Sequence, residues 1–244
     1  MVASAQLLLA QDEGHKSVSK SEFERVNSQF MIPHRSVNRV LQLCDPRDSR
    51  RKAAQEQQDR VVKLKVRFQD KSVEGTGFWI SSRCVITAAH NIFDDTKGQF
   101  AKSATVVFNG EDLEVGEMFT VQGFIISGHS AFDYGALRVN RSPRDFKAMG
   151  YGDNGGNGVI QIPGFPDGKS KLVTSDGSIM KRSNGQIQSR GAQTTEGESG
   201  APMHGVDNIA FGIHTGGHCE NEVVPINEGV QISGHVQGNL DNWK

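Results

Sequence analysis

The chain has 244 residues, and its 27 lysines and arginines are balanced by 28 aspartates and glutamates, so the formal net charge is −1. A protein that coats nucleic acid needs a clear basic excess, so this balance argues against a nucleic-acid partner. Hydrophobic residues make up 36% of the chain, enough for a globular core, but no apolar stretch approaches the roughly 18 residues of a membrane-spanning helix.

Residues 1–32 are polar and show no sustained hydrophobic periodicity, so we expect a leader or an arm that lies over a domain. The first ten residues, MVASAQLLLA, lack a basic start, and their apolar core is too short for a secretory signal. The three cysteines, Cys44, Cys84 and Cys219, cannot all pair with one another. We therefore expect a soluble protein that does not depend on disulfides, which favours an intracellular location, while a mature secreted form stays open.

A second polar stretch spans residues 45–60 (DPRDSRRKAAQEQQDR), after a possible short strand at 37–43. It has almost no apolar content, which is typical of a solvated loop or a short surface helix. Its basic run, Arg50-Arg51-Lys52, has two further interpretations: it could bind an acidic partner, or it could be exposed to proteases.

From Val61 onward, apolar residues alternate with lysine and arginine, which is typical of a half-buried strand. Glycine, asparagine, aspartate and serine separate later apolar runs at short intervals, and 28 glycines against 7 prolines suit a chain with many tight turns. This spacing predicts an all-β barrel or sandwich, with a possible helix at 236–244. The further predicted strands lie at 77–80, 84–87, 104–108, 118–126, 136–139, 159–162, 178–181, 209–214 and 230–233.

Three segments carry the residue types of acyl-transfer chemistry. His90 ends the segment TAAH, Asp133 lies in FDYGAL, and Ser199 lies between glycines in GESGAP. Acyl transfer needs a hydroxyl nucleophile, an imidazole that takes its proton, and a carboxylate that orients the imidazole. Each segment alone is weak evidence, because serine–glycine turns and histidines after strands are common. Together, in an order known from β-barrel enzymes, they predict a catalytic triad.

Gly197 and Ser199 are predicted to form the oxyanion hole with their backbone N–H groups. Both donors can point at one spot only if the turn takes a conformation that side chains obstruct, which accounts for the glycines. Removing one such donor typically lowers turnover by about 10²–10³.

These segments resemble those of the chymotrypsin-fold serine proteases, and within them those of the glutamyl endopeptidases. Residues 194–200 (TTEGESG) are similar to the nucleophile segment of that group, and residues 211–217 (FGIHTGG) to the strand that carries its specificity histidine. The resemblance covers residues 21–244. It makes residues 1–20 a leader or arm, and the charged stretch at 45–60 an insertion.

The resemblance implies an all-β fold of two six-stranded antiparallel β-barrels, with a C-terminal helix and an active-site cleft between the barrels. It implies that His90 is the general base, that Asp133 orients it, and that Ser199 is the nucleophile. The implied activity is that of a serine endopeptidase which cleaves through an acyl-enzyme after glutamate.

The resemblance also implies how substrate is bound. Thr194 and His214 would line the primary specificity pocket and bind a glutamate carboxylate, while Thr215, Gly216 and Gly217 would pair with the substrate backbone as an added strand. Protein or peptide substrates are the expected partners of a monomer that needs no metal and no cofactor.

Two departures from the family pattern stand out. Many relatives carry a cysteine directly after the catalytic histidine, paired with one on the preceding strand, whereas here Asn91 follows His90 and residues 75–78 contain no cysteine. The absence of this disulfide bridge is consistent with a redox setting unlike that of the secreted enzymes. Glu198 stands where trypsin-like enzymes carry an aspartate that pairs with a freed N-terminus, and whether it does so here is open.

Other interpretations are weaker. His204, His218, Cys219 and Glu220 match no zinc-ligand spacing, so a solvated loop after Gly217 is the better interpretation. The alternative function is that of an inert protease-fold binding domain, or of one latent until its N-terminal arm is cut. The complete set of triad residues and both oxyanion-hole residues disfavour a degenerate site.

Overall fold

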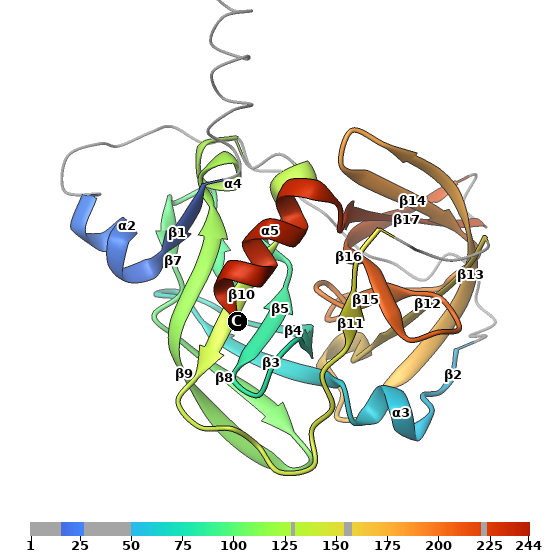
Figure 1. Cartoon of the computed structure of the whole chain (residues 1–244), viewed down its shortest axis with the longest axis horizontal. Helices are drawn as coiled ribbons and strands as arrows, with labels where there is room; N and C mark the ends of the chain where they lie inside the picture. Colours follow the sequence, from blue (N-terminus) through green and yellow to red (C-terminus); the bar gives the residue numbers. More distant parts are fainter. Residues whose placement is uncertain (1–15, 27–49, 128–129, 154–157, 221–223) are drawn as a thin grey trace, which may run out of the picture.

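The computed structural model describes residues 16–26, 50–127, 130–153, 158–220 and 224–244. Most of them form two β-barrels that lie side by side (Figure 1). The expected strand at 37–43 lies outside the described residues. The predicted architecture of two six-stranded antiparallel barrels with a C-terminal helix is confirmed.

The first barrel closes through antiparallel pairs in the order β9-β10-β5-β4-β3-β8, with β8 also paired to β9. Along β3 the apolar residues are buried, whereas Lys65 and Arg67 are exposed, so the alternation in the sequence marks the inner and outer faces. Its strands are β3 (Val61–Arg67), β4 (Ser72–Trp79), β5 (Cys84–Thr87), β8 (Ser103–Phe108), β9 (Glu111–Val121) and β10 (Gly135–Val139). Shorter elements around it are β1 (Ser17–Ser19), α2 (Lys20–Val26), η1 (Ala89–Asn91), β6 (Phe93–Asp94), β7 (Gln99–Phe100), α4 (Gln122–Ser127) and η2 (Ser130–Phe132).

The second barrel closes through antiparallel pairs in the order β16-β15-β12-β13-β14-β17, with β16 also paired to β17. Its interior holds a separate apolar cluster that includes Ile160, Ile187 and Phe211. Its strands are β12 (Val159–Gly164), β13 (Val173–Ser183), β14 (Gln186–Arg190), β15 (Pro202–His204), β16 (Ile209–Glu220) and β17 (Val224–Gln231). The short strand β11 (Gly150–Tyr151) runs parallel to β16, and the turn η3 (Pro166–Gly168) follows β12.

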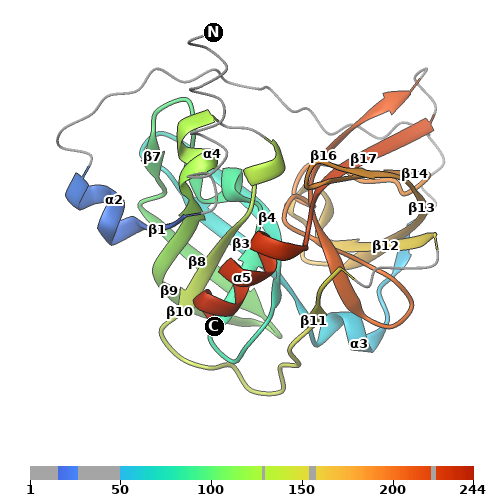
Figure 2. The same cartoon turned by 45° about the horizontal axis from the view of Figure 1, so that its top comes forward.

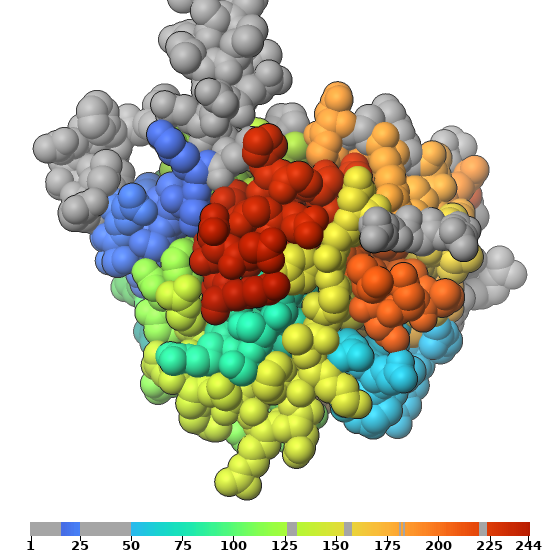
Figure 3. All heavy atoms as spheres, viewed as in Figure 1, coloured from blue at the N-terminus to red at the C-terminus, as the bar shows by residue number. Residues whose placement is uncertain are grey.

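Each barrel carries an element from the other end of the chain. The strand β2 (Arg51–Lys52), followed by α3 (Gln55–Gln58), precedes the first barrel in sequence but pairs with β13 of the second. Conversely, α5 (Gly234–Trp243) follows the second barrel and lies against β9 and β10 of the first (Figures 1 and 2). The Trp243 ring stacks on Phe119 with centroids 6.1 Å apart, and Asn239 donates to Tyr134 Oη at 2.9 Å. The space-filling view shows α5 pressed against this face (Figure 3).

The predicted strands differ from the observed ones in several places. The apolar run at 118–126 is predicted to be one strand, but β9 ends at Val121 and the helix α4 follows. β14 and β15 were not predicted, because their sequences, QIQSR and PMH, are too polar or too short to alternate clearly. The expected terminal helix is confirmed as α5.

The N-terminal arm contributes a strand at its end. Residues Ser17–Ser19 pair with residues 119–121 of β9, and Ser17 Oγ accepts a hydrogen bond from Trp243 Nε1 at 2.5 Å. Removal of a leader stays a prediction, and a cut ahead of Lys16 would leave this strand in place. Among the described residues, none of the helices has the length and apolar character to span a bilayer.

The cysteines differ in part from the expectation. Cys84 is free and buried, and burial raises the pKa of its thiol to about 12, so the thiol is unreactive. Cys219, near the end of β16, is disulfide-bonded, so the expected independence from disulfides is wrong for this residue.

Candidate active site

The structure brings His90 and Asp133 together at the end of the first barrel. His90 lies in the turn η1 after β5, and Asp133 lies just ahead of β10, which pairs with β5. One oxygen of the buried Asp133 carboxylate is 2.8 Å from His90 Nδ1, and the other accepts the His90 backbone N–H at 3.0 Å. This contact fixes Nδ1 as the proton-bearing nitrogen of a neutral imidazole and leaves Nε2 as the nitrogen able to accept a proton.

Ser199 lies in a tight turn between β14 and β15 that only glycine can complete on either side. Gly197 and Gly200 both have φ of +89°, in the left-handed region. A Cβ on Gly197 would lie 2.6 Å from the carbonyl oxygen of Phe165, and one on Gly200 would lie 2.2 Å from that of Thr76. Gly200 therefore lets the nucleophile turn approach the first barrel closely, and Gly197 lets it lie against the segment after β12.

Two donors of the first barrel, one from the backbone and one from a side chain, hold the Ser199 carbonyl. The Thr76 backbone N–H donates to it at 2.9 Å, and Asn91 Nδ2 donates at 2.8 Å. Asn91 also donates to Thr87 Oγ1 at 2.9 Å, and Gly75 leaves room for it, since a Cβ there would lie 2.6 Å from Asn91 Nδ2. Where relatives have a cysteine, this chain thus has an amide that ties the segment carrying His90 to the nucleophile turn.

The nucleophile and the base are not hydrogen-bonded to each other in the structure. Ser199 Oγ has no hydrogen-bond partner among the described residues. Hydrogen bonds of this kind are often long in enzymes without substrate and shorten when substrate binds. The Ser199 backbone N–H and the Gly197 N–H are likewise without a partner in the described part of the chain, which leaves both donors available for an oxyanion.

Thr194 and His214 come together with a third residue, Asn227 on β17, which was not predicted. Thr194 Oγ1 donates to Asn227 Oδ1 at 2.5 Å, and His214 Nε2 lies 3.2 Å from the same oxygen. Asn227 Nδ2 donates to the Ala192 carbonyl at 2.7 Å, which fixes the orientation of the amide. All three side chains are buried, so the Thr194 hydroxyl and the His214 ring meet at one acceptor inside the second barrel.

His214 lies in the interior of β16, whereas the sequence places it at the end of a strand. β16 continues to Glu220, and its register against β17 shifts between His214 and Gly216. The other ring nitrogen, Nδ1, faces the carbonyl of Glu198 at 3.2 Å. β15 and β16 form a hairpin whose turn is residues 205–208.

The residues expected to pair with substrate lie on the same strand, just beyond His214. β15 pairs with β16 only as far as Ile213, whereas β17 accompanies β16 through Gly216 and Gly217. Thr215 is buried, and its Oγ1 lies 3.4 Å from the Glu228 carbonyl. Residues 215–217 therefore pair with β17 on one side, while on the other side the neighbouring strand β15 does not extend this far.

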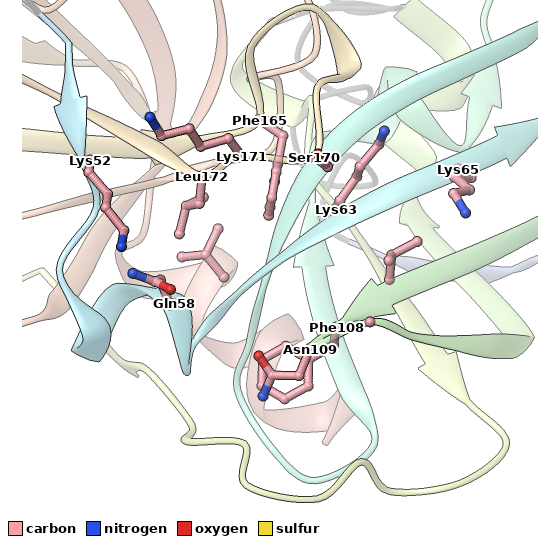
Figure 4. Close-up of a pocket in the computed structure, with 13 residues that line it drawn as sticks. Lys52, Gln58, Lys63, Lys65, Phe108, Asn109, Phe165, Ser170, Lys171 and Leu172 are labelled. Carbon is pink, nitrogen blue, oxygen red and sulfur yellow. The ribbon is translucent and has the colours of Figure 1, made fainter.

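A separate cavity of about 580 Å³ lies where β2 and β3 face the segment after β12 (Figure 4). It is lined by Lys52, Lys63, Lys65 and Lys171, together with apolar residues of both barrels. Lys63 pairs with Glu74 at 2.8 Å and Lys65 with Asp112 at 3.3 Å, so carboxylates balance half of this charge. None of the sequence-predicted site residues lines this cavity.

The histidine weighed as a metal ligand has other partners. His204 is buried in β15, where its ring contacts Gln57 Nε2 at 3.2 Å and the Gly205 carbonyl at 2.6 Å. Burial lowers the pKa of this imidazole. In the described part of the chain, no group of three or more histidine, cysteine, aspartate or glutamate side chains could hold a metal ion.

Comparisons with known proteins agree with this architecture. The chain is 28% identical to a glutamyl endopeptidase of Bacillus licheniformis over 69% of this chain and 59% of that protein. It is 24% identical to an extracellular metalloprotease of Bacillus subtilis over 75% of this chain and 63% of that protein. It thus spans less than two thirds of the length of these two relatives.

A solved structure of a Glu endopeptidase in complex with MPD superposes with a TM-score of 0.69 at 17% identity, covering 82% of this chain and 98% of that one. At this identity the likeness concerns the fold. The model of the trypsin-like peptidase domain matches residues 75–213, a stretch that includes His90, Asp133 and Ser199. Since this match spans more than half of the sequence, the chain belongs to the trypsin-like peptidase family.

Proposed function

We propose that this protein is a serine endopeptidase that cleaves peptide bonds after glutamate. The observation that carries the proposal is the buried Asp133 carboxylate, which holds His90 in one tautomer beside a turn whose Gly197 and Ser199 N–H groups have no described partner. Acyl transfer requires this combination of an oriented base and two preorganised donors.

The proposed reaction has two halves. Ser199 Oγ attacks the scissile carbonyl while its proton moves to His90 Nε2, and the resulting oxyanion accepts hydrogen bonds from the Gly197 and Ser199 N–H groups. The C–N bond then breaks, and His90 gives the proton to the leaving amine. In the second half, water attacks the acyl-enzyme with His90 again as base, and Ser199 recovers its proton when the ester bond breaks.

The preference for glutamate is supported by the buried cluster of Thr194, His214 and Asn227. Thr194 Oγ1 donates to Asn227 Oδ1, and His214 Nε2 lies 3.2 Å from the same oxygen, so a substrate carboxylate could accept hydrogen bonds from the hydroxyl and from His214 when Nε2 carries a proton. Neither donor carries a permanent charge, so binding should depend on pH through the imidazole. A site built from polar groups rejects ligands that leave those groups unpaired, by about 10⁴–10⁵ in favourable cases.

The test is a panel of fluorogenic peptides that differ only in the residue before the scissile bond. We expect glutamate to be strongly preferred, aspartate to be weaker, and glutamine or phenylalanine to be poor. Ser199→Ala should abolish hydrolysis, with a loss of about 10⁶ in turnover, while leaving the melting temperature unchanged.

The same panel separates the alternatives. Equal rates on phenylalanine, alanine and glutamate peptides would refute the glutamate preference and leave the peptidase activity standing. A well-folded wild-type protein that cleaves none of the peptides and does not react with an organophosphate probe would instead be an inert protease-fold domain or a latent one.

A further inference from the structure

A buried ion pair between Arg50 and Glu198 holds the nucleophile turn, and the proposed reaction does not use it. Arg50 Nη1 lies 3.2 Å from Glu198 Oε2 and 3.1 Å from Thr195 Oγ1. The side chains of Arg50 and Glu198 are only 6% and 0% exposed. The two residues are 148 positions apart, so the contact joins the segment ahead of the first barrel to the turn that carries Ser199.

The carboxylate of Glu198 is in a setting where it needs a cation. Burial is the dominant influence and raises its pKa to about 7, while hydrogen bonds from Thr195 and the charge of Arg50 act in the opposite direction. Oε2 accepts the Thr195 backbone N–H at 2.7 Å, whereas Oε1 has no hydrogen-bond partner among the described residues. Removing the cation from a buried pair leaves an uncompensated group, which is far more disruptive than losing a surface pair.

We propose that Arg50 is a positioning residue for the oxyanion hole, an inference that rests on the proposed function. Glu198 lies between Gly197 and Ser199, so an anchor on its side chain fixes the direction of the N–H groups on either side. The arginine charge is permanent and belongs to a side chain, so the pair with Glu198 does not require an N-terminal amine.

The neighbouring residue Arg51 provides a matched control. It pairs with Asp176 at 2.9 Å, but the side chains are 46% and 50% exposed, so this contact should contribute little. Arg50→Met and Arg51→Met remove the same charge from adjacent positions, and only the first removes it from the nucleophile turn.

The first measurement is steady-state kinetics on a glutamate peptide. We expect Arg50→Met to lower kcat by about 10²–10³ with little change in KM, because the donors act on the transition state. Arg51→Met should stay within about twofold of the wild type. Arg50→Lys should recover part of the loss, and adding Glu198→Gln to Arg50→Met should recover about tenfold, because no unpaired buried carboxyl remains.

The second measurement does not depend on activity. In a Ser199→Ala background, amide hydrogen exchange is followed for residues 194–200, and Arg50→Met should speed it at least about tenfold relative to Arg51→Met. If exchange and kcat are the same in both variants, the positioning role is wrong. If exchange speeds up but the wild type cleaves no peptide, the proposed function fails while the anchoring of the turn stands. Should Arg50→Met not fold, Arg50→Lys and Glu198→Gln are compared with Arg51→Met in the same two assays, and values equal to those of Arg51→Met would overturn the proposal.

Discussion

Asn227 provides the sharpest test of the specificity pocket, because one isosteric change reverses its chemistry. Asn227→Asp keeps the shape of the side chain and the acceptor that Thr194 and His214 now share, at 2.5 and 3.2 Å. It replaces the donor that faces the Ala192 carbonyl with a second oxygen and adds a negative charge. The pocket then presents a carboxylate where the substrate's own carboxylate should bind.

The magnitude follows from the geometry of the cluster. A substrate carboxylate bound to the Thr194 and His214 donors would lie about 4 Å from the new carboxylate at position 227, one oxygen-to-oxygen separation across a shared donor. At an effective dielectric constant of about 20, two like charges at that distance repel by about 4 kcal/mol, which corresponds to a factor of about 10³ in binding of the transition state. A glutamine substrate carries no charge and should lose far less.

The assay is kcat/KM for a matched pair of peptides with glutamate or glutamine before the scissile bond. We expect the ratio of the two values to fall by about 10³ in Asn227→Asp, with Asn227→Gln as the uncharged control. Reactivity of Ser199 with an organophosphate probe should be unchanged, which separates pocket damage from loss of the triad. If both peptides lose activity equally, or if glutamate stays preferred, the carboxylate does not bind at this cluster.

His214→Ala should remove most of the preference for glutamate over glutamine in the same peptide pair while Ser199 stays reactive toward the probe, and a retained preference would contradict the pocket assignment. Gly200→Ala should lower the free energy of unfolding by about 2–5 kcal/mol in urea titrations, from left-handed strain and from displacement of the Thr87–Thr76 hydrogen bond. Gly238→Ala, whose Cβ would meet nothing within 4 Å, is its control and should stabilise α5 by up to about 1 kcal/mol. Glu198 has its pKa raised from 4.5 to about 7 in the folded state, so its contribution to stability is present below pH 4.5 and is lost as the pH rises to 7. That loss is about 3 kcal/mol, and Glu198→Gln should remove it from a comparison of urea titrations at pH 4.5 and 7.5; an unchanged pH dependence would refute the assignment.

The sequence predicts those strands and helices in which one face is buried and the other is exposed to solvent. Alternation along β3 is clear for that reason, and the helix α5 is marked by its apolar positions Val236, Leu240 and Trp243. Prediction fails where tertiary contacts decide. The apolar run at 118–126 suits a strand or a buried helix equally, and only the packing of α4 decides between them.

The residues of the candidate site also fall into those that the sequence predicts and those that only tertiary contacts reveal. Residues whose chemistry is rare in a given motif, such as Ser199 between two glycines, can be picked out from the chain alone. Asn227 cannot, because it acts only through β17 lying beside β16, which brings its amide to His214. Arg50 is one charge in a basic run with two interpretations, and nothing local distinguishes its buried partner from the exposed partner of Arg51.

The exchange of elements between the barrels bears on how the molecule unfolds. β2 and α3 precede the first barrel yet complete a sheet of the second, while α5 follows the second barrel yet covers the first. Neither half of the chain therefore holds all of the surface that its own barrel buries, and the halves should melt in one cooperative transition. A single proteolytic cut in the connection at 140–149 would give two interlocked fragments, each held by the arm of the other, which should copurify under native conditions and part only in denaturant.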